Sequence, residues 1–550
     1  MDNPRLLLFI ALSFLVMIMW QTWQQDYQQT KTGEQAVVTE TTGTPAQTGA
    51  GGNDLPSIVV EERDAPLSVE SPAIPQGKRI QVMTDLMHLE IDTQGGDVRV
   101  VKLLGYPEST EPESPPFTML TDRNHLFIAQ SGLRSGKKNE PNHYARFTAT
   151  AESYQLQDNA ETLEIPLVWN DGGITVTKLF RLRRNSYEID VEFIIENQGS
   201  ADWLASSYFQ LQRNRPENPG GVSAFAAQTY TGGVIYSPEE KYEKISFDDM
   251  EDENLNRNIS GGWLAMIEHY FLAAWVPEEN INGKYYSRVV DGDRYVLGYV
   301  GKQTRVSPGS QQTVSSRLYA GPKDQDKLAS IATGLDLTVD YGILTFISQP
   351  LFWLLEKIHG IVNNWGWAII ILTMLIKLVF FKLSEASYKS MANMRKLAPR
   401  LKSLKERYGD DKQKLNQAMM DMYKTEKINP LGGCLPVLVQ IPVFIALYWV
   451  LLESVELRQA PFMLWLKDLS VADPYFVLPL IMGVTMLIQQ KLNPAPMDPI
   501  QAKVMMVLPI VFTVFFAFFP AGLVLYWVVN NTLSIAQQWV ITKRVEAGEA

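Results

Sequence analysis

The residue best placed to do chemistry in this sequence is a lysine inside an apolar stretch. Lys377 lies in AIIILTMLIKLVFF, seven residues before Ser384. That separation is roughly 10 Å along a helix that rises about 1.5 Å per residue. Placing a lysine at such depth in a bilayer costs at least about 2.5–3.5 kcal/mol. Two interpretations stay open: Lys377 reaches back to the cytoplasmic interface, or it faces a water-filled cavity.

Other polar residues in the apolar half of the chain could line such a cavity. Thr373 lies one helical turn before Lys377 and offers a hydroxyl on the same face. The second to sixth predicted spans contain no Asp or Glu that could pair with the lysine. They do contain other polar side chains, namely Gln440, Thr485, Gln489, Asn530 and Asn531. Packed spans use such groups for interhelical hydrogen bonds, but together with Lys377 they predict a hydrophilic groove.

No other set of residues suggests catalysis or metal binding. The histidines before the apolar half lack the spacing of metal ligands, and we assign a structural role to each of His88, His125, His143 and His269. The single cysteine, Cys434, cannot form an intramolecular disulfide. The sequence shows neither a phosphate-binding loop nor a nucleophile–base set. We therefore expect no metal, no cofactor and no enzymatic activity.

The composition divides the chain into two physically different parts. It has 550 residues and a formal charge of −11, with 46 % hydrophobic residues. The part up to Leu335 carries 29 basic and 44 acidic residues, whereas the remainder carries 20 basic and 16 acidic residues between long apolar runs. This composition excludes a disordered chain, a collagen-like repeat and a disulfide scaffold. The acidic balance also argues against nucleic-acid recognition.

The first part of the chain combines a membrane anchor, a linker and a β domain. Residues 1–23 include an apolar run long enough to span a bilayer, and no small-x-small cleavage site follows it. We interpret this run as an uncleaved signal anchor with a cytoplasmic N-terminus; a removed signal peptide is the alternative. Residues 24–77 are rich in Gln, Thr, Gly, Ala and Pro, so we expect a flexible periplasmic tether whose role is reach. Alternating apolar and polar residues across 78–335 predict a periplasmic sandwich of two antiparallel sheets.

The remainder predicts a polytopic helical membrane region. An amphipathic interfacial helix is expected at 336–364, because polar residues interrupt both of its apolar stretches. Five further spans, making six in all, are expected at 365–383, 428–452, 475–490, 505–519 and 523–541, with a tight turn at Pro520-Ala521-Gly522 between the last two. The connecting segments are 384–427, 453–474 and 491–504, and a tail follows at 542–550.

Charge sets the orientation of these spans. Between Lys382 and Lys427 there are 12 basic and 6 acidic residues, whereas Glu453 to Pro474 contains 2 basic and 4 acidic residues. The first segment is therefore cytoplasmic and the second periplasmic, with both termini in the cytoplasm. The periodicity of 384–427 predicts a helical hairpin in which Pro399 kinks the first arm. This hairpin is either a cationic loop that fixes topology or a docking surface for ribosomes, targeting factors or nascent chains.

Three long stretches resemble the YidC membrane protein insertases in their long Gram-negative form. They are NPLGGCLPVLVQIPVFIALYWVL, SVELRQAPFMLWLKDLSVADPYFVLPLIMGVTM and FPAGLVLYWVVNNTLSIAQQ. The resemblance implies a five-helix insertase core, a large periplasmic β-sandwich and a location in the bacterial inner membrane. It places the groove cation on Lys377, where the long forms usually carry arginine, and its partner hydroxyl on Thr373. It assigns substrate contact to Phe444, Met482, Phe515, Tyr526 and Trp527.

The resemblance implies a function in inserting and helping to fold inner-membrane proteins, alone or with the Sec translocon. A client with an apolar segment and an acidic tail would be attracted by Lys377, and the membrane potential would favour outward movement of the tail. The expected partners are nascent membrane proteins, the Sec translocon, ribosomes or targeting factors, and the lipid bilayer. A secondary transporter is a rival, but it would require internal repeats and midplane acids. A membrane-anchored sugar-binding or enzymatic β domain and a pure scaffold are the other rivals.

Overall fold

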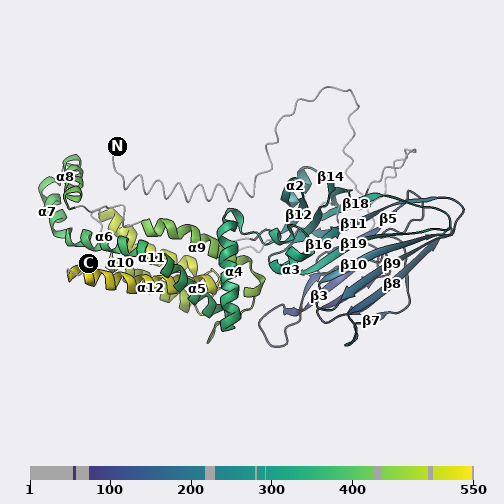
Figure 1. Ribbon diagram of the computed structural model, residues 1–550, viewed down its shortest axis with the longest axis horizontal. Helices are drawn as coiled ribbons and strands as arrows, with labels where there is room; N and C mark the ends of the chain where they lie inside the picture. Colours follow the sequence, from purple (N-terminus) through teal and green to yellow (C-terminus); the bar gives the residue numbers. More distant parts are fainter. Residues whose placement is uncertain are drawn as a thin grey trace, which may run out of the picture.

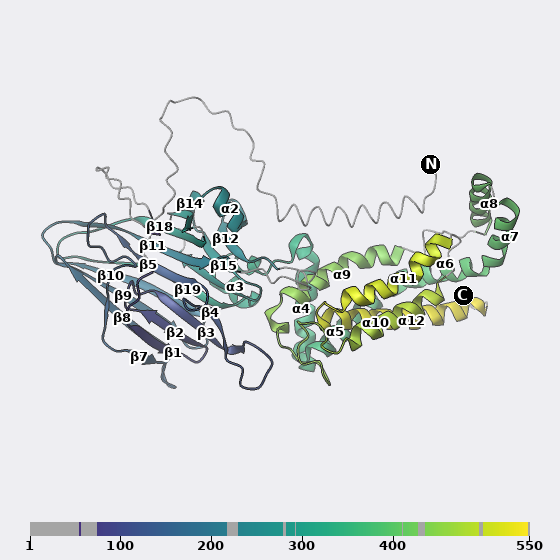
Figure 2. The same cartoon turned by 180° about the vertical axis from the view of Figure 1, so that it is seen from behind.

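The computed structural model has a β domain at one end of the molecule and a helical region at the other (Figures 1 and 2). It describes residues 54–56, 74–216, 229–278, 282–291, 293–409, 411–426, 435–493 and 499–547. The predicted first span at residues 1–23 lies outside the described residues, as does Cys434. The prediction of a β-sandwich followed by a helical region is confirmed.

The β domain consists of two mainly antiparallel sheets. The first sheet has the strand order β14 (Asn256–Ser260), β17 (Asn282–Val290), β18 (Arg294–Val306), β11 (Trp203–Asn214), β5 (Phe127–Arg134), β3 (Val98–Pro107), β2 (Met87–Asp92), β1 (Arg79–Met83) and β7 (Ser153–Gln155), with β4 (Pro116–Leu120) paired to β3. The second has the order β13 (Lys241–Ile245), β12 (Gly232–Ser237), β15 (Trp263–Ile267), β16 (Phe271–Pro277), β19 (Gln311–Pro322), β10 (Glu188–Asn197), β9 (Ile174–Arg183), β8 (Thr162–Asp171) and β6 (Thr148–Ala149). Short helices α2 (Phe247–Asp252) and α3 (Gln325–Ile331) follow β13 and β19.

Alternation of side chains explains why these segments form a sandwich. In β10, Ile189, Val191, Phe193 and Ile195 are all fully buried, because every second residue of a strand points to the same face. The turn between β8 and β9 contains Gly172 and Gly173 with φ of 55° and 84°. Glycine adopts such positive φ values without steric cost, which allows the tight hairpin.

The helical region begins with α4 (Thr345–Val362) and contains several apolar helices. They are α5 (Trp365–Val379), α9 (Leu435–Glu453), α10 (Val477–Leu492), α11 (Pro499–Phe516) and α12 (Ala521–Glu546). Among the described residues, no single helix meets the length and hydropathy expected of a membrane crossing; α5 and α6 (Phe381–Lys396) meet it only as a pair, with a bend of 67° between them. The straight segment expected at 365–383 is therefore interrupted at Phe380.

The segment expected to form a helical hairpin contains three helices. After α6 come α7 (Ala398–Tyr408) and α8 (Lys412–Thr425). The helix breaks at Leu397, and Pro399 lies in the first turn of α7, where its missing N–H is tolerated. Leu397, Leu401 and Tyr423 are buried together and hold α7 against α8.

The β domain packs directly on the loop that follows α9. Val455 belongs to the buried core of the sandwich. Arg458 donates a hydrogen bond of 2.8 Å to the carbonyl of Pro107, and its guanidinium lies 5.6 and 5.5 Å from the rings of Phe117 and Phe271. His269 on the loop before β16 contacts the carbonyl of Leu452 through Nε2 at 2.8 Å. These contacts connect the sandwich to the end of α9.

Candidate functional site

Lys377 lies in the last turn of α5, directly before the bend at Phe380. The unpaired carbonyl groups at the C-terminal end of a helix carry partial negative charge, which favours a cation in the last turn. The residues around the bend include no proline or glycine. The sequence therefore predicts a straight span with Lys377 roughly 10 Å from its Ser384 end, whereas the structure places the lysine in the last turn of α5.

The ammonium of Lys377 connects three helices through polar contacts. Its Nζ donates a hydrogen bond of 2.7 Å to Oγ of Ser534 on α12 and lies 3.5 Å from Oε1 of Gln440 on α9. The Gln440 amide in turn donates to Oδ1 of Asn530. Ser534 donates its own hydroxyl hydrogen to the backbone carbonyl of Asn530 at 2.7 Å. Lys377, Gln440, Ser534 and Asn530 thus form one connected polar cluster, which we call the Lys377 cluster.

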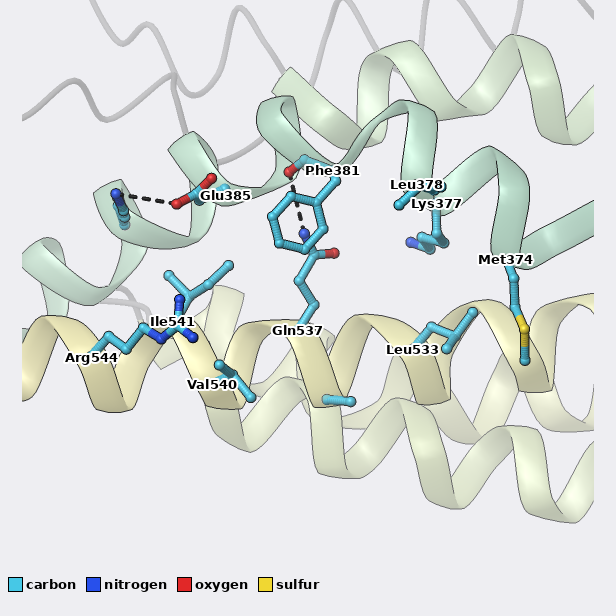
Figure 3. Close-up of a pocket in the computed structure, with 12 residues that line it drawn as sticks. Met374, Lys377, Leu378, Phe381, Glu385, Leu533, Gln537, Val540, Ile541 and Arg544 are labelled. Atoms are coloured by element: carbon cyan, nitrogen blue, oxygen red, sulfur yellow. Dashed lines mark hydrogen bonds and ion pairs between the residues drawn. The ribbon is translucent and has the colours of Figure 1, made fainter. Parts of the chain in front are cut away.

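A cavity of about 550 Å³ lies between the α5–α6 bend and α12. Figure 3 shows Lys377, Leu378 and Phe381 on one side of it and Leu533, Gln537 and Val540 of α12 on the other. The full lining is Met374, Lys377, Leu378, Phe381, Glu385, Lys389, Leu533, Ala536, Gln537, Val540, Ile541 and Arg544. Gln537 donates to the backbone carbonyl of Phe381 at 3.3 Å, which spans the cavity (Figure 3). The lining is therefore apolar with polar groups at a few points.

The charges around this cavity have a positive excess. Its lining contains three cations, Lys377, Lys389 and Arg544, and one carboxylate, Glu385. Glu385 forms ion pairs with Lys382 at 3.4 Å and Lys389 at 3.3 Å. Its charge is therefore already matched by two cations of its own helix. The net field in the cavity attracts anions.

The other groove residues predicted from the sequence lie close to the Lys377 cluster but not all within it. Thr373 is fully buried and donates to the carbonyl of Ile369 in its own helix at 2.6 Å. Asn531 contacts Oγ1 of Thr485 on α10 at 3.4 Å. The hydroxyl that contacts Lys377 is therefore that of Ser534 and not that of Thr373.

The aromatic residues assigned to substrate contact form a separate cluster outside the cavity lining. The Phe444 ring lies 6.0 Å from that of Tyr526 and 4.9 Å from that of Trp527. Met482 is fully buried, whereas Phe515 is 45 % exposed. These residues therefore differ in access: Phe515 faces outward, and Met482 is covered.

Sequence reasoning missed two buried polar residues on α12. Ser534 contacts Lys377, and Gln538 donates to the carbonyl of Leu492 at 3.2 Å and to Oδ1 of Asn493 at 3.0 Å. Asn530, Ser534 and Gln538 follow each other at intervals of four residues, so they share one helix face. That spacing was visible in the sequence and could have identified them. No group of three His, Cys, Asp or Glu side chains that could hold a metal ion occurs among the described residues.

Comparison with known proteins places both parts of the chain in one family. Residues 79–354 match the family model of the YidC periplasmic domain, and residues 357–548 match that of the 60Kd inner membrane protein. The first match covers the β domain, and the second covers the helices that carry the Lys377 cluster.

Two full-length relatives agree with these matches. A protein of Methylococcus capsulatus named membrane protein insertase YidC is 53 % identical over 552 residues, which cover 100 % of both chains. A protein of the same name from Alkalilimnicola ehrlichii is 52 % identical, with coverage of 100 % of this chain and 97 % of the relative. A solved structure described as an active YidC insertase covers 84 % of this chain and 92 % of its own, at 18 % identity and a TM-score of 0.38.

These matches fix the compartment of the β domain and the class of activity. The family is that of an inner-membrane protein with a periplasmic domain, and the sandwich corresponds to that periplasmic domain. Its members are insertases and not enzymes. The family models and the full-length identity agree over nearly the whole chain, so this chain belongs to the YidC family of membrane protein insertases.

Proposed function

We propose that this chain inserts client proteins into the bilayer through the cavity beside Lys377. The observation that carries the proposal is the position of the Lys377 ammonium, 2.7 Å from Ser534 and at the edge of a cavity of about 550 Å³. The hydroxyl and amide partners of the Lys377 cluster are neutral. They solvate the lysine without cancelling its charge, so the charge stays available to a client.

The lining of the cavity matches a client that is apolar with an acidic tail. Lys377, Lys389 and Arg544 attract a carboxylate, while Met374, Leu378, Phe381, Leu533 and Val540 offer an apolar surface. A polar tail that enters this cavity avoids part of the cost of leaving water. The apolar segment of the client moves along the same helices into lipid.

The energy for this transfer comes from the client and the membrane. Each Leu or Ile that reaches the centre of the bilayer contributes about −0.3 to −0.6 kcal/mol. The membrane potential, positive outside, favours outward movement of one negative charge by about 2.3 kcal/mol per 100 mV. Together these terms drive insertion without a nucleotide.

We also propose that the five residues assigned to substrate contact, Phe444, Met482, Phe515, Tyr526 and Trp527, receive the apolar part of the client. Phe515 is 45 % exposed and is available for direct contact. Met482 is buried on α10, so it contacts a client only where α10 separates from its neighbours. A photo-crosslinker at Phe515 should therefore give client adducts at shorter times than one at Met482. Equal yields at both positions would contradict this order of contact.

The helices α7 and α8 are proposed as a cytoplasmic docking surface for ribosomes or targeting factors. Exposed cations support this role, among them Arg400 and Lys414, whose side chains are 68 % and 71 % exposed. Ribosome co-sedimentation should weaken when both are replaced by glutamate. Unchanged co-sedimentation would leave fixing topology as the role of this segment. A separate experiment tests the proposed cytoplasmic location of both termini. Single cysteines are placed at each end of the chain in membrane vesicles and labelled from either side of the membrane.

Insertion itself is tested with the purified full chain in liposomes. The client is a single-span protein with an acidic tail, and the measurement is its protection from added protease. Wild type and Lys377→Arg should insert it, whereas Lys377→Glu should fail. Lys382→Glu is the matched control, because the Lys382 side chain is 92 % exposed and undergoes the same change of charge. Equal insertion by all four proteins would refute the charged cavity.

A lack of insertion by wild type would refute autonomous activity. The same assay with purified Sec translocon added then tests the second proposed mode, in which the insertase works beside the translocon. Insertion that depends on both proteins would support that mode.

A further inference from the structure

A second polar cluster, far from Lys377, lies in the β domain on the face of the first sheet that points away from the second sheet. Tyr208 and Gln210 of β11 lie on this face, because Phe209 and Leu211, which alternate with them, belong to the core of the sandwich. Tyr286 of β17 pairs with Gly298 of β18, and Gly298 in turn pairs with Gln210 of β11. Tyr286 therefore lies on the same face of the sheet as Gln210. Strands β17, β18, β11 and β5 follow one another in this sheet, and Figure 1 labels the last three of them.

Two glycines make room for the tyrosines of this face. A Cβ atom at Gly298 would lie 2.7 Å from the hydroxyl of Tyr286, and one at Gly132 would lie 2.7 Å from the hydroxyl of Tyr208. Both distances are shorter than a side chain tolerates. The tyrosines fill the space that side chains at these two positions would take. With Val290, Val296 and Val300 they form an apolar surface on which Leu55 packs, and we call this surface the recess.

The recess is occupied by three residues of the linker, Asp54, Leu55 and Pro56. Leu55 packs against the apolar wall. Asp54 and Pro56 are buried, although their neighbours in the chain on both sides lie outside the described residues. This placement differs from the expectation that residues 24–77 are a flexible tether that only sets the distance between the first apolar run and the β domain.

The carboxylate of Asp54 has its own binding groups. Its Oδ1 lies 3.2 Å from Nε2 of His143 and accepts a hydrogen bond from the hydroxyl of Tyr144. The hydroxyl of Tyr208 accepts from the backbone N–H of His143 at 2.8 Å and lies 2.7 Å from Nδ1 of the same residue. A hydroxyl that already accepts at its oxygen has its hydrogen free for Nδ1. Tyr208 thus holds the His143 ring through Nδ1 and leaves Nε2 facing the carboxylate of Asp54.

The backbone of the tripeptide is bound as well. Arg288 Nη1 donates to the carbonyl of Leu55 at 2.7 Å, and Arg134 Nη1 donates to the carbonyl of Pro56 at 2.6 Å. Pro56 has no N–H that would need a partner, and a proline favours an extended conformation in the residue before it. An Asp-Leu-Pro segment is therefore partly ordered for this site before it binds.

We propose that this recess is a binding site for an extended Asp-Leu-Pro peptide, and that the chain's own linker is its occupant. Every part of the tripeptide has a counterpart: a histidine and a tyrosine for the carboxylate, a recess for the leucine, and two guanidinium groups for the carbonyls. Binding at Asp54 leaves residues 24–53 between the first apolar run and the β domain, in place of residues 24–77. The greatest reach of that linker falls from roughly 180 Å to roughly 100 Å at about 3.3–3.6 Å per residue. The site thus limits how far the first apolar run can separate from the β domain.

The chain itself supplies the matched control. Asp64-Ala65-Pro66 repeats the carboxylate and the proline at the same spacing but has alanine in place of leucine. If the recess recognises the whole tripeptide, a peptide with Asp-Ala-Pro should bind far more weakly than one with Asp-Leu-Pro. If only the charge matters, the two peptides should bind equally.

The test uses the full chain in detergent and fluorescence anisotropy of the labelled peptide GGNDLPSIV, which corresponds to residues 51–59. Leu55→Asp in the chain should empty the recess, so that this variant binds the peptide at least tenfold more tightly than wild type. The peptide GGNDAPSIV should bind the same variant at least tenfold more weakly. Absence of binding to Leu55→Asp, or equal binding of the two peptides, would overturn the proposal.

A second measurement does not depend on added peptide. In a Cys434→Ser background, Leu55→Cys and Ala65→Cys each introduce a single thiol whose reaction rate with a maleimide is followed. Cysteine at position 55 should react at least tenfold more slowly than cysteine at 65, and Arg288→Ala should raise the rate at 55 only. Equal rates at both positions would refute the binding of the linker in this recess.

Discussion

Replacing Lys377 by methionine separates the functional role of its charge from any structural role. The substitution keeps the length of the side chain and removes the ammonium. It relieves a lysine burial cost of about 2.5–3.5 kcal/mol and removes a charged hydrogen bond to Ser534 worth about 1.5–3 kcal/mol. Because these two terms nearly cancel, the thermal unfolding midpoint of Lys377→Met should stay within about 4 °C of wild type.

The effect on insertion should depend on the charge of the client. A carboxylate about 6 Å from the ammonium gains roughly 3 kcal/mol at an effective dielectric constant near 20. Water in the cavity weakens this attraction, so we expect only about half of this energy to lower the insertion barrier. That reduction corresponds to a factor of about ten in the insertion rate. Lys377→Met should therefore slow a client with an aspartate in its tail about tenfold and leave an asparagine tail nearly unchanged.

The assay compares initial rates of protease-protected insertion for the two clients with wild type, Lys377→Met and Lys382→Met. The informative quantity is the ratio of the aspartate rate to the asparagine rate, because it cancels differences in the amount of active protein. Lys382→Met should keep the wild-type ratio, since its side chain is 92 % exposed. If Lys377→Met also keeps that ratio, the charge of Lys377 does not act on the client, and the charged-cavity mechanism is refuted.

Three further predictions concern stability. Gly366→Ala should lower the unfolding free energy by about 1–3 kcal/mol in a denaturant titration, because its Cβ would lie 2.1 Å from the ring of Phe462; an unchanged midpoint would contradict the tight packing of α5 on that ring. Burial lowers the pKa of His269 from 6.5 to about 4, so the unfolded chain binds more protons than the folded chain as pH falls below 6.5. The unfolding free energy of the β domain, measured with urea, should then fall by at most about 2 kcal/mol between pH 7 and pH 5. In His269→Gln the unfolding free energy should fall by less over the same range. Burial likewise lowers the pKa of Lys178 from 10.5 to about 7; stability should rise by about 2 kcal/mol from pH 7 to pH 9, and a rise of the same size in Lys178→Met would refute that assignment.

Much of the architecture could be predicted from local sequence patterns. The alternation in β10, with Ile189, Val191 and Phe193 on one face, requires a strand with a buried side. The apolar run that begins at Trp365 predicts a helix, and α5 begins at that residue. Lys377 is anomalous in the sequence because a charge in an apolar run is costly wherever the run lies. These inferences succeed because periodicity and burial cost depend on residues close together in the chain.

The partners of the functional residues were decided by the tertiary structure. Ser534 is 157 residues from Lys377, and only the packing of α12 beside α5 brings the two together. The bend at Phe380 has no local signal, and because of this bend Lys377 lies at a helix end and not inside a continuous span. The binding of Asp54 likewise depends on His143 and Tyr144, which lie about ninety residues further along the chain.

The sequence by itself determined which elements form and which charge is anomalous, because both follow from short-range patterns. The tertiary structure alone decided which hydroxyl contacts that charge, where the cavity opens, and which part of the linker is bound. Each of these features depends on contacts between segments that are distant in sequence. The free energy of such contacts comes from packing and mutual burial, and these produce no periodic pattern in the sequence.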